Sequence, residues 1–192
     1  MRIIGLCGSL RGGSYNRKLL DTVGSALPNG AELELYEGIG ELPPYSEEID
    51  VEPAPPAVRR LREAIEHADA LLIATPEYNS SIPGALKNAI DWASRPFPDN
   101  SLRDKPAAVV GASRSPFGAA WAQAELRKVL KTCGADVIDR EVPVGRVHEQ
   151  FDAAGDLRDA LLRGQLAGVA GELVRRATGS DGGPGDELSR AA

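Results

Sequence analysis

The sequence predicts an α/β fold in which a parallel sheet lies between two layers of helices. Short apolar runs that suit buried strands alternate with amphipathic segments at helical spacing along most of the chain. Three of these runs, residues 2–7, 70–75 and 105–112, are apolar enough to be buried parallel strands. The length of 192 residues, 42% of them hydrophobic, suits one compact domain.

The expected elements follow one another in a regular alternation. After the first strand, a helix over residues 16–26 has its apolar positions at helical spacing and stops at Pro28-Asn29-Gly30. Residues 31–36 alternate between polar and apolar side chains, which predicts a one-faced strand near a sheet edge. The remaining expected elements are helix 58–69, strand 70–75, helix 85–94, strand 105–112, helix 118–133, strand region 135–144 and a last helix over about 157–176.

Strands that alternate with helices are joined by right-handed crossovers, which place helices on both faces of the sheet. Five such strands predict a flavodoxin-like three-layer sandwich with the strand order 2-1-3-4-5. A ligand of this fold sits where the order reverses, beyond the carboxyl ends of strands 1 and 3. The two most unusual loops of the sequence follow those two strands.

Composition and charge exclude several classes of protein. The 22 basic and 28 acidic residues give a net charge of −6, which disfavours nucleic acid as a partner. No apolar run has the length of a membrane span, and no leader precedes the first strand, so we expect an untargeted protein without a membrane partner. Cys7 and Cys133 form no paired motif, which predicts a reducing, cytoplasmic setting and no metal site. We expect the domain to occupy residues 1–177 and the Gly- and Ser-rich tail 178–192 to be disordered.

The loop after the first strand, residues 8–17, has the chemistry of an anion cradle. Its backbone N–H groups and the following helix N-terminus favour an anion at the point where the strand order reverses. Ser9, Ser14 and Asn16 add side-chain donors, and Arg11 adds a planar cation suited to phosphate oxygens. A simple turn with Ser14 as a helix cap is the alternative for any one of these residues.

The same loop lacks the marks of other phosphate sites. Ser14 stands where a Walker loop needs its lysine, which disfavours nucleotide hydrolysis. The G-x-G-x-x-G fingerprint is absent, which disfavours a Rossmann dehydrogenase. Cys7 and Arg11 match a thiol phosphatase loop only loosely, and Cys7 is expected to be a buried residue at the strand end. Arg17 and Lys18 are expected on a solvated helix face.

The loop after the central strand, residues 75–84, is stiffened by a proline near each end. Successive backbone N–H groups beside Tyr78 suit a planar heterocycle with carbonyl and ring-nitrogen acceptors, such as an isoalloxazine. A turn with a helix cap near Ser81 and Tyr78 in the core is the alternative. The loop 111–118 follows strand 4 and would wall the same crevice.

These loops lie within three stretches that resemble the NADPH-dependent FMN reductase family, which includes bacterial quinone, chromate and azo-dye reductases. The stretches are LCGSLRGGSYNRKLL, TPEYNSSIPGALKNAIDW and KPAAVVGASRSPFGAAWAQAELRKVL, and the likeness spans about residues 2–144. The resemblance implies FMN, with its phosphate held by residues matching Ser9, Arg11, Ser14, Tyr15 and Asn16. It implies that the ring is held by residues matching Pro76, Glu77, Tyr78 and Asn79, with the loop that contains Ser113 beside it.

The resemblance also implies a homodimer or homotetramer. Leu86 and Ile90 are expected in the core, whereas Trp92 and the loop 95–97 are the expected subunit contacts. The family usually has two consecutive glycines in the third loop, whereas this chain has Gly118 followed by Ala119. Trp121 is also bulkier than the residue expected at its position.

The activity implied is an NAD(P)H oxidoreductase that reduces a quinone or another small acceptor, such as an azo dye, chromate or free flavin. NADPH or NADH would deliver hydride to the flavin and leave before the acceptor binds, in a ping-pong cycle. No protein side chain is expected to be catalytic, and His67 and His148 are expected at the surface. Ser113 lacks the context of a nucleophile elbow, which disfavours an esterase. The alternatives are a flavodoxin-type electron carrier, against which Arg11 argues, and a flavin-free interaction protein.

Overall fold

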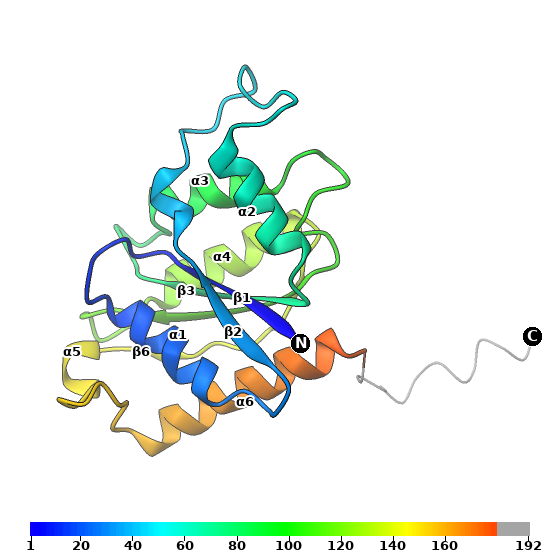
Figure 1. Cartoon of the computed structure of the whole chain (residues 1–192). Helices are drawn as coiled ribbons and strands as arrows, with labels where there is room; N and C mark the ends of the chain where they lie inside the picture. The colour runs from blue at the N-terminus through cyan, green and yellow to red at the C-terminus, as the bar shows by residue number, and fades with distance from the viewer. Residues whose placement is uncertain (180–192) are drawn as a thin grey trace, which may run out of the picture.

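A computed structural model of the chain describes residues 1–179, which form a parallel sheet covered by helices on both faces (Figure 1). The predicted tail, residues 178–192, lies outside the described residues apart from its first two positions. None of the helices within residues 1–179 combines the length and apolar character that a membrane span requires.

The sheet has the predicted order, with β2 at one edge and the apolar β3 in the middle. All neighbouring strands are parallel; Ile3 of β1, for example, lies opposite Leu33 of β2 and Ala70 of β3. The order is β2-β1-β3-β4-β5, with β6 also paired to β4. The strands are β1 (Arg2–Cys7), β2 (Glu32–Tyr36), β3 (Ala70–Thr75), β4 (Pro106–Ala112), β5 (Asp136–Val137) and β6 (Pro143–Val144).

The last strand region is broken into two pieces, whereas one region over 135–144 was predicted. Between β5 and β6 lie three consecutive charged residues, Asp139, Arg140 and Glu141, which are outside the sheet and form ion pairs with residues of two helices. Arg127 of the fourth helix contacts Glu141 at 3.1 Å, and Arg140 contacts Glu172 of the last helix at 3.4 Å. Side-chain pairing of this segment with both helical layers therefore interrupts the strand.

The helices lie within a few residues of their predicted positions. Figure 1 shows α2, α3 and α4 above the sheet and α1 and α6 below it, which confirms the three-layer arrangement. Two short elements, η1 and α5, were not predicted, because four residues are too few to show a helical period. The helices are α1 (Tyr15–Ser25), η1 (Gly38–Glu41), α2 (Pro56–Glu66), α3 (Gly84–Ala93), α4 (Ala120–Thr132), α5 (Val147–Gln150) and α6 (Ala160–Ala177).

Successive residues of the central strands point into two separate cores. Ile3 and Leu72 pack toward α1 and α6, while Ile4 and Leu71 pack toward α2, α3 and α4. All six residues of β3 are buried, as its apolar sequence predicted. Burying each large aliphatic side chain contributes about 1.5–3 kcal/mol, so the sheet is a firm base for the loops at its ends.

Trp92 is fully buried, so the prediction that it contacts a second subunit was wrong. Its indole N–H donates to the Pro43 carbonyl at 2.8 Å, and the Tyr45 ring meets it edge-on at 4.9 Å. The long segment between η1 and α2 folds back over α3 and supplies these partners, which helical spacing alone does not reveal. Leu86 and Ile90 lie in the core as predicted.

Candidate functional site

The loops after β1 and β3 touch at the carboxyl edge of the sheet. The Gly8 amide donates to the Ala74 carbonyl at 2.8 Å. A Cβ on Gly8 would lie 3.2 Å from Cδ of Pro76 and 2.9 Å from a methyl group of Leu86. Only glycine lets the two loops approach this closely without displacing their neighbours.

The first loop presents a run of free donors. Within residues 1–179, the backbone amides of residues 9–14 donate no hydrogen bond. Gly13 has a φ of 69°, and a Cβ on Gly12 or Gly13 would meet open space. The loop borders a cavity of about 290 Å³ that is lined by Ser9, Arg11 and Ser14, among others. A row of unpaired N–H groups before a helix N-terminus fits an anion.

Arg17 and Lys18 line the same cavity, so the prediction of a purely solvated face for them was incomplete. A guanidinium nitrogen of Arg17 lies 2.6 Å from a carboxylate oxygen of Glu37, which follows β2. The Lys18 ammonium lies 5.8 Å from the centre of the Tyr15 ring and 5.6 Å from that of Phe151. Arg11 of the loop and two basic residues of α1 thus line one cavity.

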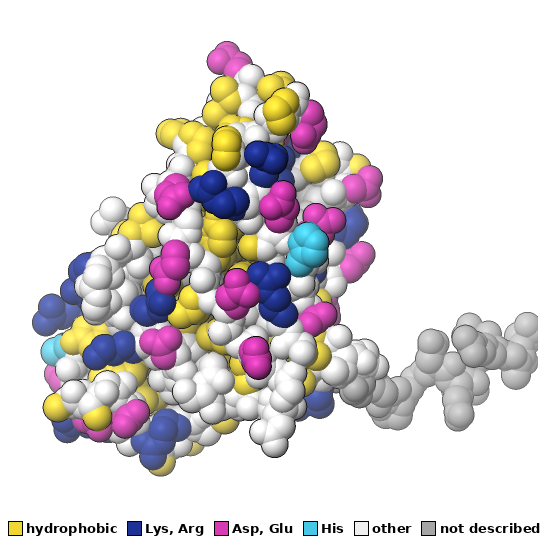
Figure 2. Space-filling model, viewed as in Figure 1, with side chains coloured by type: hydrophobic (Ala, Val, Ile, Leu, Met, Phe, Trp, Pro, Cys, Tyr) yellow, Lys and Arg dark blue, Asp and Glu magenta, His cyan; other side chains and the backbone are white. Residues whose placement is uncertain are grey.

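The Tyr15 ring lies near the cationic groups of both Arg11 and Lys18. Its ring stacks on Phe151 with centroids 5.9 Å apart, and the Arg11 guanidinium carbon lies 6.0 Å from its centre. Phe151 lies in a charged segment that follows α5 and showed no motif in the sequence. Figure 2 shows Lys and Arg side chains gathered at the left of the view, over the first loop and α5.

Ser14 and Asn16 both have structural partners. Ser14 caps α1, because its hydroxyl oxygen accepts from the Asn16 amide at 3.2 Å. The Asn16 side chain accepts from the Ala112 amide at 3.0 Å and donates to the Ala112 carbonyl at 3.1 Å. Asn16 therefore ties the start of α1 to the end of β4.

The second loop closes in a tight turn at its tip. Tyr78 and Ser81 exchange two backbone hydrogen bonds of 3.0 and 3.1 Å, and Asn79 and Ser80 between them have φ values of 52° and 61°. The alternative with a cap at Ser81 is wrong, since the Ser81 hydroxyl donates to Glu125 at 2.7 Å and α3 begins at Gly84. Tyr78 is 52% exposed, so it is not a core residue.

Glu77 connects the second loop to α4. Its carboxylate accepts from the Ala122 amide at 3.2 Å, in the first turn of that helix. The residue at the α4 N-cap, Ala119, provides no side-chain hydrogen bond. Glu77 therefore serves as the missing cap from another loop and fixes its own loop in place.

The third loop stands beside the second. The Ser113 carbonyl accepts a hydrogen bond from the Val147 amide at 3.1 Å, and the Ser113 hydroxyl accepts one from the Ser115 amide at 3.1 Å. Gly118 has a φ of 60°, and a Cβ on it would lie 2.5 Å from the Pro143 backbone. The loop is thus held closely against the end of β6.

The Cys7 thiol lines the first-loop cavity and is half-buried. Burial raises the pKa of this thiol above its ordinary value, while a hydrogen bond from the thiol to the Ser9 carbonyl opposes that shift. A thiol that stays protonated at neutral pH is a weak nucleophile. Cys7 lies at the strand end as predicted, but it is only partly buried. No group of three potential metal ligands occurs within the described part of the chain.

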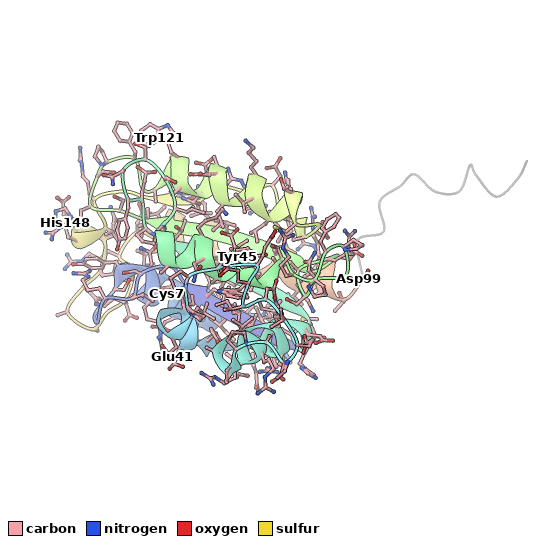
Figure 3. The ribbon with its side chains drawn as sticks, turned by 90° about the horizontal axis from the view of Figure 1, so that it is seen from above. Cys7, Glu41, Tyr45, Asp99, Trp121 and His148 are labelled. Carbon is pink, nitrogen blue, oxygen red and sulfur yellow. The ribbon has the colours of Figure 1, made fainter. Side chains whose placement is uncertain are left out.

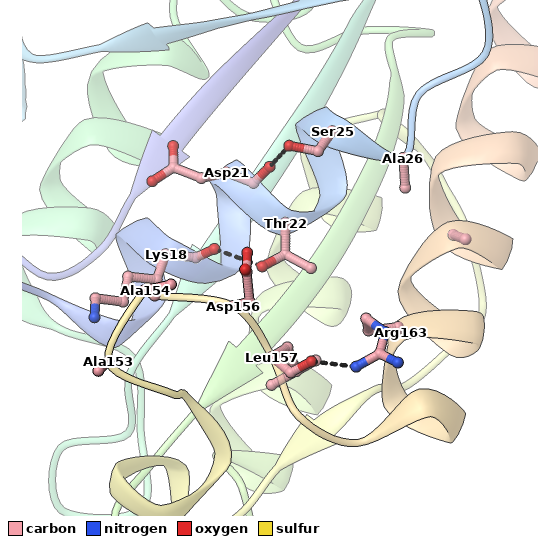
Figure 4. A pocket seen from close by; sticks show the side chains of 12 residues that line it. Lys18, Asp21, Thr22, Ser25, Ala26, Ala153, Ala154, Asp156, Leu157 and Arg163 are labelled. Atoms are coloured by element: carbon pink, nitrogen blue, oxygen red, sulfur yellow. Dashed lines mark hydrogen bonds between the residues drawn. The ribbon is translucent and has the colours of Figure 1, made fainter.

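A larger hollow of about 890 Å³ lies elsewhere, between α1, α6 and residues 153–157 (Figure 4). Polar groups at its wall already have partners: the Thr22 hydroxyl donates to the Lys18 carbonyl at 2.8 Å, and Arg163 donates to the Leu157 carbonyl. It does not lie among the loops at the carboxyl ends of β1, β3 and β4. The joined loops are therefore the better candidate for the functional site.

The chain is also similar in sequence to known proteins. The sequence profile of the family described as NADPH-dependent FMN reductase matches residues 1–149. The chain is 46% identical over 160 residues to an NAD(P)H-dependent FMN reductase of Pseudomonas aeruginosa, covering 83% of this chain and 85% of the relative. It is 37% identical over 183 residues to a quinone reductase of Escherichia coli, covering 92% and 96%.

A solved structure is similar over nearly the same length. The flavoenzyme FerB, an NAD(P)H:(acceptor) oxidoreductase from Paracoccus denitrificans, superposes with a TM-score of 0.81 at 38% identity and covers 93% of this chain and 97% of its own. The three loops of the site all lie within the matched residues. The chain belongs to the NADPH-dependent FMN reductase family, whose members use FMN and take electrons from NAD(P)H.

Proposed function

We propose that the chain is an FMN-dependent NAD(P)H:quinone oxidoreductase. In the overall reaction NAD(P)H loses a hydride and becomes NAD(P)⁺, and the quinone gains that hydride and one proton from solvent to become the hydroquinone. The observation that carries the proposal is the joined pair of loops, one with free amides and Arg11, the other with a tight turn beside an exposed aromatic ring. Relatives with the names quinone reductase and NAD(P)H:quinone oxidoreductase support it.

The residues present fit FMN. The free amides of residues 9–14 and the lining side chains Ser9, Arg11 and Ser14 match a phosphate dianion in donor number and charge. Tyr15 positions Arg11, and Asn16 fixes the start of the helix beneath the cradle. When bound, FMN carries two electrons between the nicotinamide and the acceptor.

The chain would contribute orientation and hydrogen bonds. Within residues 1–179, the amides of Glu77 and Asn79 donate no hydrogen bond and could face ring acceptors, while Pro76 fixes the approach of the loop. Tyr78 and the loop of Ser113 would lie beside the ring. His67 and His148 are exposed and enter no step of the proposed reaction.

The remaining features are proposed on the same basis. Because the donor and the acceptor would use one open face, we infer that they bind in turn, in a ping-pong cycle. Azo dyes, chromate and free flavin are further acceptors to be assayed, with NADPH and NADH compared as donors. We also infer a cytoplasmic homodimer or homotetramer, for which the exposed Phe97 is a candidate contact.

Replacing Arg11 by alanine tests the phosphate assignment. We expect FMN binding to weaken by about 1.5–3 kcal/mol, roughly ten- to a hundredfold, because a charge-assisted hydrogen bond is lost. Titration of the flavin-free protein with FMN gives the affinity. Arg59→Ala, at an exposed position on α2, is the matched control and should bind FMN normally. Equal affinity in both variants would remove Arg11 from the site.

Steady turnover distinguishes an enzyme from an electron carrier. The FMN-loaded protein is mixed with NADPH and a quinone in the absence of any partner protein. An oxidoreductase oxidises the nicotinamide over many cycles, whereas a flavodoxin-type carrier does not. Nicotinamide oxidation limited to one equivalent per flavin would overturn the proposed activity.

A further inference from the structure

Two exposed aromatic rings stand together in the third loop and the first turn of α4. Phe117 and Trp121 meet edge to face, with ring centroids 4.9 Å apart and an interplanar angle of 61°. They are 57% and 50% exposed, respectively. Figure 3 shows Trp121 pointing outward on the same side of the molecule as His148 and away from Asp99. The two rings together form an exposed apolar surface.

The pair lies against the second loop. The Glu77 carboxylate binds the amide of Ala122, the residue after Trp121, at 3.2 Å. One turn further along α4, Glu125 accepts a hydrogen bond of 2.7 Å from the Ser81 hydroxyl. Trp121 and Glu125 are four residues apart and share a helix face, so the turn of Tyr78 and Ser81 runs along the face that carries Trp121.

The third loop holds the two rings in a fixed place. The Arg146 amide donates to the Ser115 carbonyl at 2.9 Å, and Gly118 packs against the Pro143 backbone. Ala119 is fully buried at a φ of 60°, a conformation that only close packing stabilises in a residue with a side chain. We call the rings of Phe117 and Trp121 the aromatic wall. A surface that is already ordered loses little conformational entropy when a ligand binds.

The chemistry of the wall favours a flat carbonyl compound. Within residues 1–179, the Trp121 indole N–H donates no hydrogen bond, so it is free to meet a carbonyl oxygen. The carboxylates of Glu77 and Glu125 lie beside the wall, and they disfavour an anionic ligand. An uncharged aromatic ring with carbonyl groups matches both properties.

We propose that Phe117 and Trp121 form the outer wall of the acceptor site and select flat, uncharged quinones over anionic acceptors. The proposal rests on the proposed function and adds the class of acceptor and the residues that choose it. The competing occupant of the same surface is a second copy of the chain.

Kinetic measurements on the FMN-loaded full chain test the wall. Trp121→Ala should raise the KM for menadione roughly three- to tenfold, the range set by an aromatic contact of about 0.5–1.5 kcal/mol. Trp121→Phe should restore most of the affinity. The kcat/KM for ferricyanide, an anion that would gain nothing from the aromatic contact, should stay unchanged. Leu161→Ala, at an exposed apolar position on α6, is the control.

A binding measurement gives a readout independent of turnover. Trp121 is the exposed tryptophan and Trp92 is buried, so menadione should quench the Trp121 emission on binding. Phe117→Ala keeps this reporter and should weaken menadione binding by the same three- to tenfold factor. Three results for Trp121→Ala would overturn the proposal. They are an unchanged KM for menadione, an equal loss of kcat/KM for menadione and ferricyanide, and a smaller oligomer than the unmodified chain on size-exclusion chromatography. Failure of the proposed function would differ, because the unmodified chain would then oxidise no NADPH with menadione.

Discussion

Asn16 illustrates, at the scale of a single residue, how a predicted ligand can also hold the site together. The sequence pointed to it as a phosphate donor, but its carboxamide forms two hydrogen bonds with the peptide group of Ala112, which lies 96 positions along the chain. The side chain is 4% exposed. Asn16 therefore links the start of α1 to the end of β4, and this link fixes where the first loop, residues 8–17, meets α1.

Replacing Asn16 by alanine should destabilise the protein by about 2–4 kcal/mol, because the buried amide and carbonyl of Ala112 would each lose a partner. Urea unfolding followed by circular dichroism measures this free energy. Asn29→Ala, at an exposed position in the turn after α1, should change it little. If both variants unfold at the same urea concentration, the two hydrogen bonds between Asn16 and Ala112 contribute nothing to the free energy of unfolding.

Cys7 predicts a specific pH dependence. Burial raises its pKa in the folded protein above the ordinary 9.0, so the unfolded chain loses this proton first as the pH rises. The contribution of the thiol to stability is present below pH 9.0 and is lost as the pH passes through the raised folded value. The loss in urea midpoint across that window should be smaller in Cys7→Ser, and an identical pH profile in the two proteins would contradict the assignment.

At the scale of elements, the site is assembled by contacts in which one loop completes another. Glu77 caps α4, whose own N-cap residue Ala119 has no side chain to do so. Gly8 allows the loops after β1 and β3 to touch. Each loop is therefore positioned by a neighbour that is remote in sequence, on a sheet whose core is fully buried.

Glu77→Ala should destabilise the fold by about 1 kcal/mol, as expected for the loss of a helix cap, and should also weaken FMN binding by freeing the second loop. Glu77→Gln keeps an oxygen acceptor for the Ala122 amide and should lose less of both. Chemical unfolding and FMN titration of the two variants provide the measurements. A loss of the same size in both variants would show that the charge, not the cap, matters.

At the scale of the whole molecule, flavin binding and folding are linked, since the cradle exists only when the strands bring the loops together. FMN at a hundred times its dissociation constant should raise the free energy of unfolding by about 2.7 kcal/mol. Exchanging residues 76–79 for a glycine-serine linker should abolish the bound flavin, seen by absorbance, while circular dichroism still reports a folded domain. Retention of flavin by the exchanged protein would place the ring elsewhere.

Much of the fold was readable in the sequence because apolar patterning is a local signal. The apolar run of residues 70–75 predicted a central strand, and it is one. Trp92 was misplaced because its partner Pro43 lies in a segment without periodicity. The strand region predicted over 135–144 contains both β5 and β6, and the sequence did not show that charged residues paired with two helices lie between them. Periodicity shows that a side chain is apolar on one face, but it does not show which distant segment covers that face.

The sequence by itself predicted the strand order, which the structure confirms, because hydrophobic period is a property of neighbouring residues. The sheet edge and the first loop that we propose for FMN were also chosen from the sequence, on loop composition. Tertiary structure alone decided that Asn16 bonds Ala112, that Glu77 caps a helix from another loop, and that Arg17 and Lys18 share a cavity with Arg11. These contacts join residues far apart in the chain, and hydrogen bonding depends on distances of a few ångströms that only the folded sheet sets.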